Sequence, residues 1–131
     1  MDSAGQADRL LHRALTQQII GAAFAVHREL GPGFLEKVYE TALLIDLAEK
    51  GVPAKSQAEI PVYYRSRPVG LYYADLLVDG IIICEIKAVQ AIIPAHEAQL
   101  LHYLKATGLQ LGLIFNFGAR SLEFRRLAKS K

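Results

Sequence analysis

The sequence has almost no excess of either charge, a single cysteine and no long apolar run. Its 131 residues contain 15 Lys and Arg against 13 Asp and Glu, a net charge of +2. This excludes nucleic-acid binding by bulk charge alone, so any basic surface must be local. One cysteine, no basic and apolar leader, and no apolar run of about 18 residues together predict a soluble cytoplasmic protein without a membrane segment.

Several common ligand-binding motifs are also missing. The "GPG" at 31–33 is not followed by Gly-Lys-Ser or Gly-Lys-Thr, which excludes a phosphate loop. His96 and His102 would point in different directions on a helix, which argues against a zinc site there. Cys84 has no obvious histidine partner, so we expect a packed core thiol rather than a nucleophile.

Apolar residues, 52% of the chain, follow periodic patterns that predict one α/β domain over residues 1–131. Residues 1–7 are expected to be frayed, and Asp8 is expected to cap a helix that ends near Leu30. A second helix is predicted over 34–50, strands over 56–64, 69–78 and 81–88, a third helix from Pro94 to Gly108, and two final strands. The expected order is two helices, four strands, a helix and two strands, with a mixed sheet flanked by helices.

The predicted second helix combines an apolar stripe with Glu36 and Tyr39, each of which allows a structural and a functional interpretation. Its helical spacing runs through Leu35, Val38, Tyr39, Ala42 and Ile45. Glu36 lies in the first turn, where the helix dipole favours a carboxylate whatever the protein does. Tyr39, one turn on, could hydrogen-bond in the same region or simply cover the core.

Three ionisable residues interrupt the apolar stretch "YADLLVDGIIICEIKA" at 73–88. Glu85 and Lys87 leave the same face of a strand, and Asp75 lies on the strand before it. An ion pair with Lys87 at a polar end of the sheet would explain them. Two carboxylates and an ammonium are also what magnesium-assisted phosphodiester cleavage requires.

The third predicted helix places His96, Gln99 and Tyr103 on one face. This pattern is typical of a solvated helix face with a half-buried tyrosine. It would also suit accessory groups beside the carboxylates.

With these residues assembled, the chain resembles the GxxExxY family, whose motif stands here as Gly33, Glu36 and Tyr39 in "LGPGFLEKVYE". The resemblance covers nearly everything from His27 to Leu127. It includes "PVYY", "YADLLVDG", "CEIKAV", "HEAQLLHYLKATG" and "GLIFNFG" in the expected order. That family looks like a branch of the PD-(D/E)xK nucleases, which implies a restriction-endonuclease-like core.

The resemblance implies a catalytic set and a cofactor. Its residues are Asp75, Glu85, Lys87, Glu36 and Gln99, with Asp75, Glu85 and the backbone carbonyl of Ile86 holding Mg²⁺ or Mn²⁺. The residue before Asp75 is Ala74 instead of proline, a frequent departure in the superfamily. The implied substrate is a nucleic acid, DNA in the first place, and a homodimer could grip it.

A shared metal site requires a particular turn between the two strands. A plain two-residue turn at Asp79 and Gly80 would put Asp75 and Glu85 on opposite faces. We therefore predict an odd-length or bulged turn at 78–81. With Val78, Asp79 and Gly80 in the loop, Asp75 would face Ile83 and lie diagonal to Glu85 on the same face.

Three functions agree with the sequence. The first is a magnesium-dependent nuclease. The second is a non-cleaving module that binds nucleic acid or a protein on the same fold. The third is a structural protein whose sheet contains a charged pair.

Overall fold

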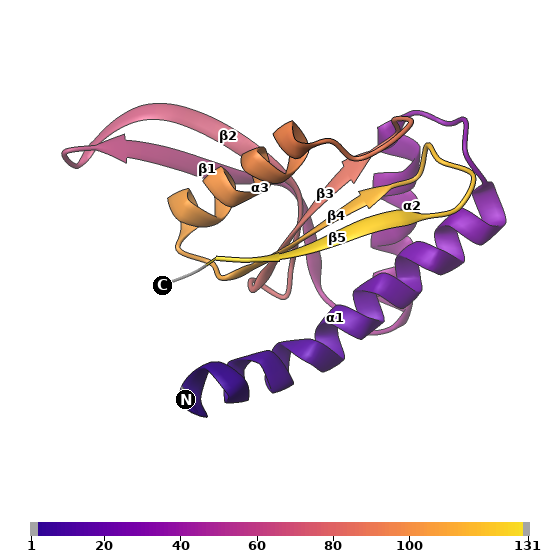
Figure 1. Ribbon diagram of the computed structural model, residues 1–131, viewed down its shortest axis with the longest axis horizontal. Helices are drawn as coiled ribbons and strands as arrows, with labels where there is room; N and C mark the ends of the chain where they lie inside the picture. Colours follow the sequence, from indigo (N-terminus) through magenta and orange to yellow (C-terminus); the bar gives the residue numbers. More distant parts are fainter. Residues whose placement is uncertain (1–2, 130–131) are drawn as a thin grey trace.

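The computed structural model describes the backbone of residues 3–129 and the side chains of residues 12–129. Two helices come first, followed by three strands, a third helix and two strands (Figure 1). The elements are α1 (Ser3–Leu30), α2 (Glu36–Glu49), β1 (Ala54–Tyr64), β2 (Arg67–Val78), β3 (Ile82–Lys87), α3 (Pro94–Thr107), β4 (Leu111–Asn116) and β5 (Glu123–Ala128).

The strands form one mixed sheet in the order β1-β2-β3-β4-β5. Only the β3–β4 pair is parallel, because α3 carries the chain back across the sheet between these two strands. The other three pairs are antiparallel. The predicted α/β fold with a mixed sheet and flanking helices is thus confirmed.

Helices cover the sheet on both faces and produce two cores (Figure 1). On one side, α1 and α2 bury Ile19, Tyr39 and Leu43 against Leu76, Cys84 and Phe115, among others. On the other side, α3 buries Leu100, Tyr103 and Leu104 against Ala74, Ile83 and Ile114. Because β3 and β4 are covered on both faces, they contain almost only apolar residues.

β1 and β2 continue beyond the other strands as a hairpin arm (Figure 1). The β1–β2 register lacks the pair Gln57 and Asp75, and Gln57 has a φ of 51°. Leu76 packs in the α1–α2 core, whereas Ala74 packs in the α3 core. Residues two apart on a regular strand share a face, so the arm turns relative to the sheet at Asp75.

The turn between β2 and β3 is bulged, as predicted. Ile81 N–H donates to the Val78 carbonyl at 3.0 Å, closing a tight turn over Asp79 and Gly80, whose φ values are 53° and 67°. Val78 nevertheless pairs with Ile82, so Ile81 is the extra residue of a β-bulge.

The predicted loop residues were displaced by one position. Asp79 and Gly80 both adopt the left-handed conformation that a tight turn favours, so the extra residue comes after the turn and Val78 stays in the strand. Continuing the register from Leu76 and Cys84 places Asp75 directly across from Glu85, not across from Ile83.

Other boundaries also differ from the predicted ones. α1 begins at Ser3, upstream of Asp8, and includes residues 4–7, two of which are alanines that favour helix. Met1, Asp2 and the side chains of Asp8 and Leu11 lie outside the described residues. In residues 3–129, three strands precede α3, one fewer than expected, because residues 54–87 form two long strands and one short strand.

The apolar residues of the helical stripe in α2 are only partly buried. Leu35 is 80% exposed and Ile45 57% exposed, whereas Tyr39, Glu40, Leu43 and Leu47 are buried. α2 has apolar residues on most of its circumference, so periodicity does not decide which side packs. Among the described residues, no helix has both the length and the apolar character needed to cross a membrane.

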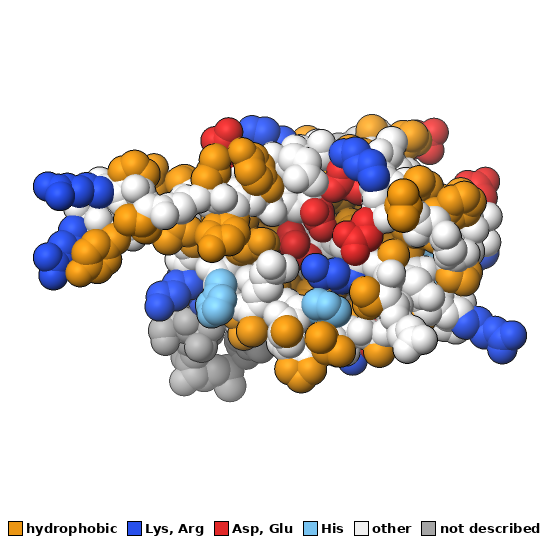
Figure 2. All heavy atoms as spheres, turned by 90° about the horizontal axis from the view of Figure 1, so that it is seen from above, with side chains coloured by type: hydrophobic (Ala, Val, Ile, Leu, Met, Phe, Trp, Pro, Cys, Tyr) orange, Lys and Arg blue, Asp and Glu red, His pale blue; other side chains and the backbone are white. Residues whose placement is uncertain are grey.

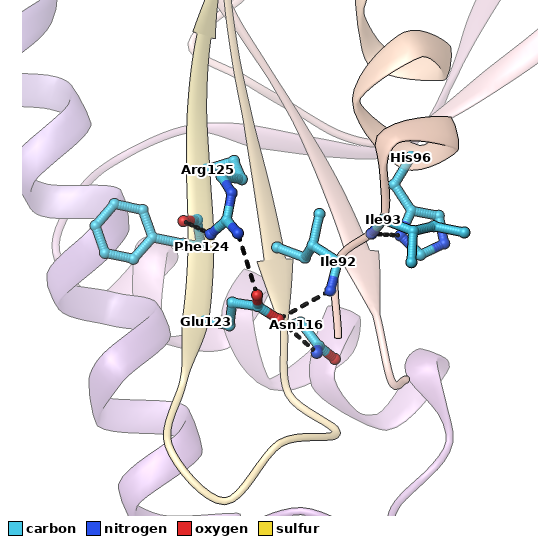
Figure 3. Close-up of polar contacts among 7 residues, drawn as sticks. All are labelled: Ile92, Ile93, His96, Asn116, Glu123, Phe124 and Arg125. Carbon is cyan, nitrogen blue, oxygen red and sulfur yellow. Dashed lines mark hydrogen bonds and ion pairs between the residues drawn. The ribbon is translucent and has the colours of Figure 1, made fainter. Parts of the chain in front are cut away.

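A polar network holds the loop that joins β3 to α3. Asn116 is fully buried, and its Oδ1 accepts hydrogen bonds from the N–H groups of Val89 (3.0 Å) and Gly118 (2.9 Å). Its Nδ2 donates to Glu123 Oε1 at 3.1 Å, and the same oxygen accepts from Ile92 N–H at 2.9 Å (Figure 3). These bonds fix the backbone that follows Lys87.

Gly118 tests how tightly this loop is packed. A Cβ at Gly118 would lie 2.5 Å from both the N and O atoms of Val89, so Gly118→Ala must displace backbone. We expect it to lower the free energy of unfolding by about 1–3 kcal/mol, measured with urea.

Gly21→Ala is the matched control, since a Cβ at Gly21 in α1 meets no atom within 4 Å. It should stabilise the protein by up to about 1 kcal/mol through helix propensity. Equal stability of Gly118→Ala and the wild type would contradict the packing described for the loop.

Candidate active site

The side chains of Asp75 and Glu85 each accept a backbone hydrogen bond from the opposite strand at the point where β2 and β3 separate. Beyond Leu76 and Cys84 the backbone ladder ends. In its place, Asp75 N–H donates to Glu85 Oε2 at 3.0 Å, and Ile86 N–H donates to Asp75 Oδ2 at 2.7 Å. The two side chains thus occupy the gap between the strands and satisfy backbone donors that have no ladder partner there.

Each carboxylate keeps one oxygen outside these hydrogen bonds. No hydrogen bond of the described residues involves Oδ1 of Asp75 or Oε1 of Glu85. Neither atom is among the buried polar atoms without a partner, so both reach solvent. The pair therefore presents two free oxygens at the mouth of the gap.

Burial and neighbouring carboxylates disfavour the charged forms of both Asp75 and Glu85. Burial, and then the charge of Asp75, raise the pKa of Glu85 to about 8. Burial raises the pKa of Asp75 too, against the hydrogen bond from Ile86, and Glu40 and Glu36 add to the increase. Figure 2 shows acidic side chains gathered near the middle of one face. A cation bound here would stabilise both ionised forms.

Lys87 follows Glu85 on the same face of β3. Its charge lowers the pKa of both Asp75 and Glu85, which places the ammonium within their field. The ion pairs of the described residues nevertheless join Lys37 to Glu40, Lys50 to Asp46 and Arg125 to Glu123. Lys87 is therefore not held by a direct ion pair with either carboxylate.

α2 contributes two carboxylates, of which one was predicted from the sequence. Glu36 lies in the first turn, exposed, and raises the pKa of both Asp75 and Glu85. Glu40 was missed. It is 3% exposed, and it accepts from Lys37 Nζ at 2.6 Å and from Gln57 Nε2 at 2.8 Å.

Glu40 connects α2 to the point where the arm turns. Gln57, its partner, stands at the β1 position opposite Asp75 and has the positive φ noted above. The signal that could have found Glu40 is its position one helical turn after Glu36, on the same side of the helix.

The contacts of Tyr39 are those of a structural residue. It is fully buried and stacks on Phe117 with ring centroids 4.6 Å apart. Its hydroxyl donates to the Gly31 carbonyl at 2.6 Å and accepts from Phe34 N–H at 3.1 Å. Tyr39 thus fixes the loop before α2, in which Gly33 has a φ of 117°, and so sets where Glu36 begins the helix.

The three predicted residues of α3 do not form one group. His96 Nδ1 accepts from Ile93 N–H at 3.1 Å and so caps the helix (Figure 3). Gln99 is exposed and has no hydrogen bond to Asp75 or Glu85 among the described residues. Tyr103 is 8% exposed and packs in the same core cluster as Ala74, the residue before Asp75. Burial, and then the charges of Glu85 and Asp75, raise its pKa.

The side chains alone do not form a complete metal site. Within the described residues, no three His, Cys, Asp or Glu side chains are grouped to hold an ion. The donor set still suits a hard cation, because two carboxylate oxygens are free and Mg²⁺ retains several water ligands in most protein sites.

Known proteins are similar to this chain in sequence and in fold. A family model described as "PD-(D/E)XK nuclease superfamily" matches residues 13–127. The chain belongs to the PD-(D/E)XK nuclease superfamily. The opened β2–β3 pair brings together Asp75 and Glu85, two of the site residues that the sequence predicts.

A solved structure supports the superfamily's fold. The structure titled "Crystal structure of SSO0001" is similar, with a TM-score of 0.54, at 13% sequence identity. The similarity covers 95% of this chain and 63% of that chain, so this chain spans less than two thirds of the other's length. None of the curated proteins matches this chain significantly.

The raised pKa of Glu85 predicts an inverse effect of pH on the stability of the metal-free protein. An acid whose folded-state pKa is raised contributes most stability below its unfolded pKa, and loses that contribution as pH rises to the folded value. In EDTA, the free energy of unfolding should therefore fall between about pH 4.3, the ordinary glutamate value, and about pH 8.

The variant Glu85→Gln isolates this effect, because its amide oxygen can still accept from Asp75 N–H. Urea unfolding at several pH values should give a flatter profile for the variant. Parallel profiles for the variant and the wild type would show that Glu85 titrates normally.

Proposed function

We propose that this protein is a divalent-metal-dependent nuclease that hydrolyses phosphodiester bonds in nucleic acid, DNA in the first place. The observation that carries the proposal is the pair of hydrogen bonds across the opened strands, in which Glu85 accepts from Asp75 N–H and Asp75 accepts from Ile86 N–H. Two neighbouring carboxylate charges are costly unless something neutralises them, and Lys87 supplies only one positive charge. A structural ion pair would instead have joined Lys87 directly to a carboxylate.

Asp75, Glu85 and the Ile86 carbonyl would hold Mg²⁺ or Mn²⁺. Ile86 N–H points toward β2, and the N–H and C=O groups of one strand residue point to the same side, so this carbonyl faces the same gap. When bound, the metal lowers the pKa of a water ligand and neutralises charge on the phosphate.

The remaining residues act around these three metal-binding groups. Lys87 orients the attacking water and stabilises the negative charge that builds on the phosphate. Glu36, exposed beside the pair, serves as an accessory carboxylate for a further water. Gln99 and His96 lie on the α3 side of the site, where they can contact the nucleic-acid backbone. Tyr39 and Glu40 position α2.

The second candidate is a non-cleaving module that binds nucleic acid on the same fold. It is favoured by the absence of a complete set of metal-binding side chains in the described residues. It differs from the nuclease in predicting steeply salt-dependent binding with no turnover.

Three substitutions test catalysis directly. Asp75→Asn, Glu85→Gln and Lys87→Met should each lower metal-dependent cleavage by at least about 100-fold, since each removes a ligand or a charge-stabilising group. The assay uses single-stranded, duplex and branched DNA and RNA, with Mg²⁺ or Mn²⁺. Lys87→Met should also keep the wild-type melting temperature, because no ion pair of the described residues depends on Lys87.

Glu49→Gln is the control, since Glu49 ends α2 and lies in a separate pocket with Val26 and Ile45. It should cleave at the wild-type rate. Cleavage retained by Glu85→Gln and Lys87→Met would contradict the nuclease assignment. So would an absence of cleavage on every substrate. Unfolding of Lys87→Met would make Lys87 a structural counter-ion.

A further inference from the structure

A large groove lies between the hairpin arm and α3. Its volume is about 810 Å³. One wall comes from β1 and β2, and the other from exposed positions of α3. The lining residues that matter below are Tyr63, Tyr72, Gln99, His102, Tyr103 and Lys105.

The arm exposes two tyrosine rings to solvent. Tyr63 is 61% exposed and Tyr72 is 52% exposed, although both line the groove. Tyr72 lies 5.9 Å, centroid to centroid, from the buried Tyr103 on the opposite wall. Large exposed aromatic surface of this kind is typical of a binding site.

The charges around the groove are basic. Lys105 and His102 line its α3 wall, and none of the described lining residues is acidic. Arg65 and Arg67 are exposed at the end of the arm, and the Arg65 guanidinium lies 5.0 Å from the Tyr64 ring centroid. Figure 2 shows basic side chains at the tip of the arm and hydrophobic ones along it, toward the acidic cluster.

The groove borders the strand that carries Asp75. Tyr103 lines the groove and packs in the same core cluster as Ala74, the residue before Asp75. A polymer lying along the arm would therefore arrive at the carboxylates.

We propose that this groove binds single-stranded nucleic acid and guides it to the Asp75–Glu85 pair, with bases stacked on Tyr72 and Tyr63 and phosphates near Arg65, Arg67 and Lys105. The inference rests on the proposed function and names its substrate class. Unpaired bases expose the faces that exposed tyrosines can stack on, whereas a duplex hides them. A net charge of +2 also suits a short contact with one strand better than the extended phosphate contacts of a duplex.

An apolar peptide or a second copy of the chain could also cover exposed tyrosines. Lys105 in the groove and the exposed Arg65 and Arg67 at the end of the arm favour a phosphate polymer, because they would neutralise its charge.

Binding is measured by fluorescence anisotropy in EDTA, so that no cleavage occurs. The probes are labelled single-stranded DNA of about 16 nucleotides, the same sequence as RNA, the same sequence as duplex, and an abasic strand of equal length. We expect tighter binding of the single strands than of the duplex or the abasic strand.

Tyr72→Ala should weaken single-strand binding by about tenfold, and Tyr72→Phe should restore it, because stacking needs only the ring. Tyr73→Ala is the matched control: Tyr73 is the next residue of β2, 46% exposed, and does not line the groove. Replacing Arg65 and Arg67 by Ala should make binding less sensitive to salt. The slope of the logarithm of the binding constant against the logarithm of the salt concentration should fall by roughly 0.7 for each phosphate contact that is lost.

Three results would overturn the inference. The first is that Tyr72→Ala and Tyr73→Ala weaken single-strand binding equally. The second is that the protein prefers the duplex, or binds the abasic strand as tightly as the normal strand; the third is a dimer in light scattering that Tyr72→Ala dissociates. Failure of the two proposals is distinguishable. Tyr72-dependent binding without any cleavage would refute the nuclease alone. Cleavage unaffected by Tyr72→Ala would refute the groove alone.

Discussion

The hydrogen bonds that the Asp75 and Glu85 side chains accept across β2 and β3 determine most of what is distinctive in this protein. Each side chain takes the place of a backbone hydrogen-bond partner on the opposing strand. β2 and β3 can therefore separate without leaving buried backbone N–H groups unpaired. The same two residues are held side by side in partly buried surroundings, where neither ionises easily. Fold and chemistry thus depend on one contact.

The surrounding structure keeps this contact in place from three directions. On the α2 side, Tyr39 fixes the preceding loop, and Glu40 binds Gln57 at the turn of the arm. On the other side, Asn116 and Glu123 hold the loop that leaves β3 after Lys87. The bulge at Ile81 sets the register that aligns Asp75 with Glu85. A site built on strands and supported by such contacts is preorganised for a ligand.

The sequence alone predicted the parts of this structure that depend on local pattern. Long apolar strands, Pro94 at the start of α3 and the Asp-Gly turn all gave usable signals. The parts that failed depend on tertiary choice. α2 is apolar on several sides, so its pattern could not reveal that Glu40 is buried or that Leu35 is exposed. The bulge residue, too, could not be located, since the apolar triplets around it fit either register. The role of Gln99, which the family resemblance implies, stays a prediction.

The central claim is that a divalent cation neutralises the Asp75 and Glu85 pair, and diffraction can observe this directly. Crystals grown with Mn²⁺ should give an anomalous difference peak between the two carboxylates, with the Ile86 carbonyl directed at it. Crystals of Glu85→Gln under the same conditions should lose that peak. Wild-type crystals with no manganese between Asp75 and Glu85, or with the same peak retained in Glu85→Gln, would contradict the account.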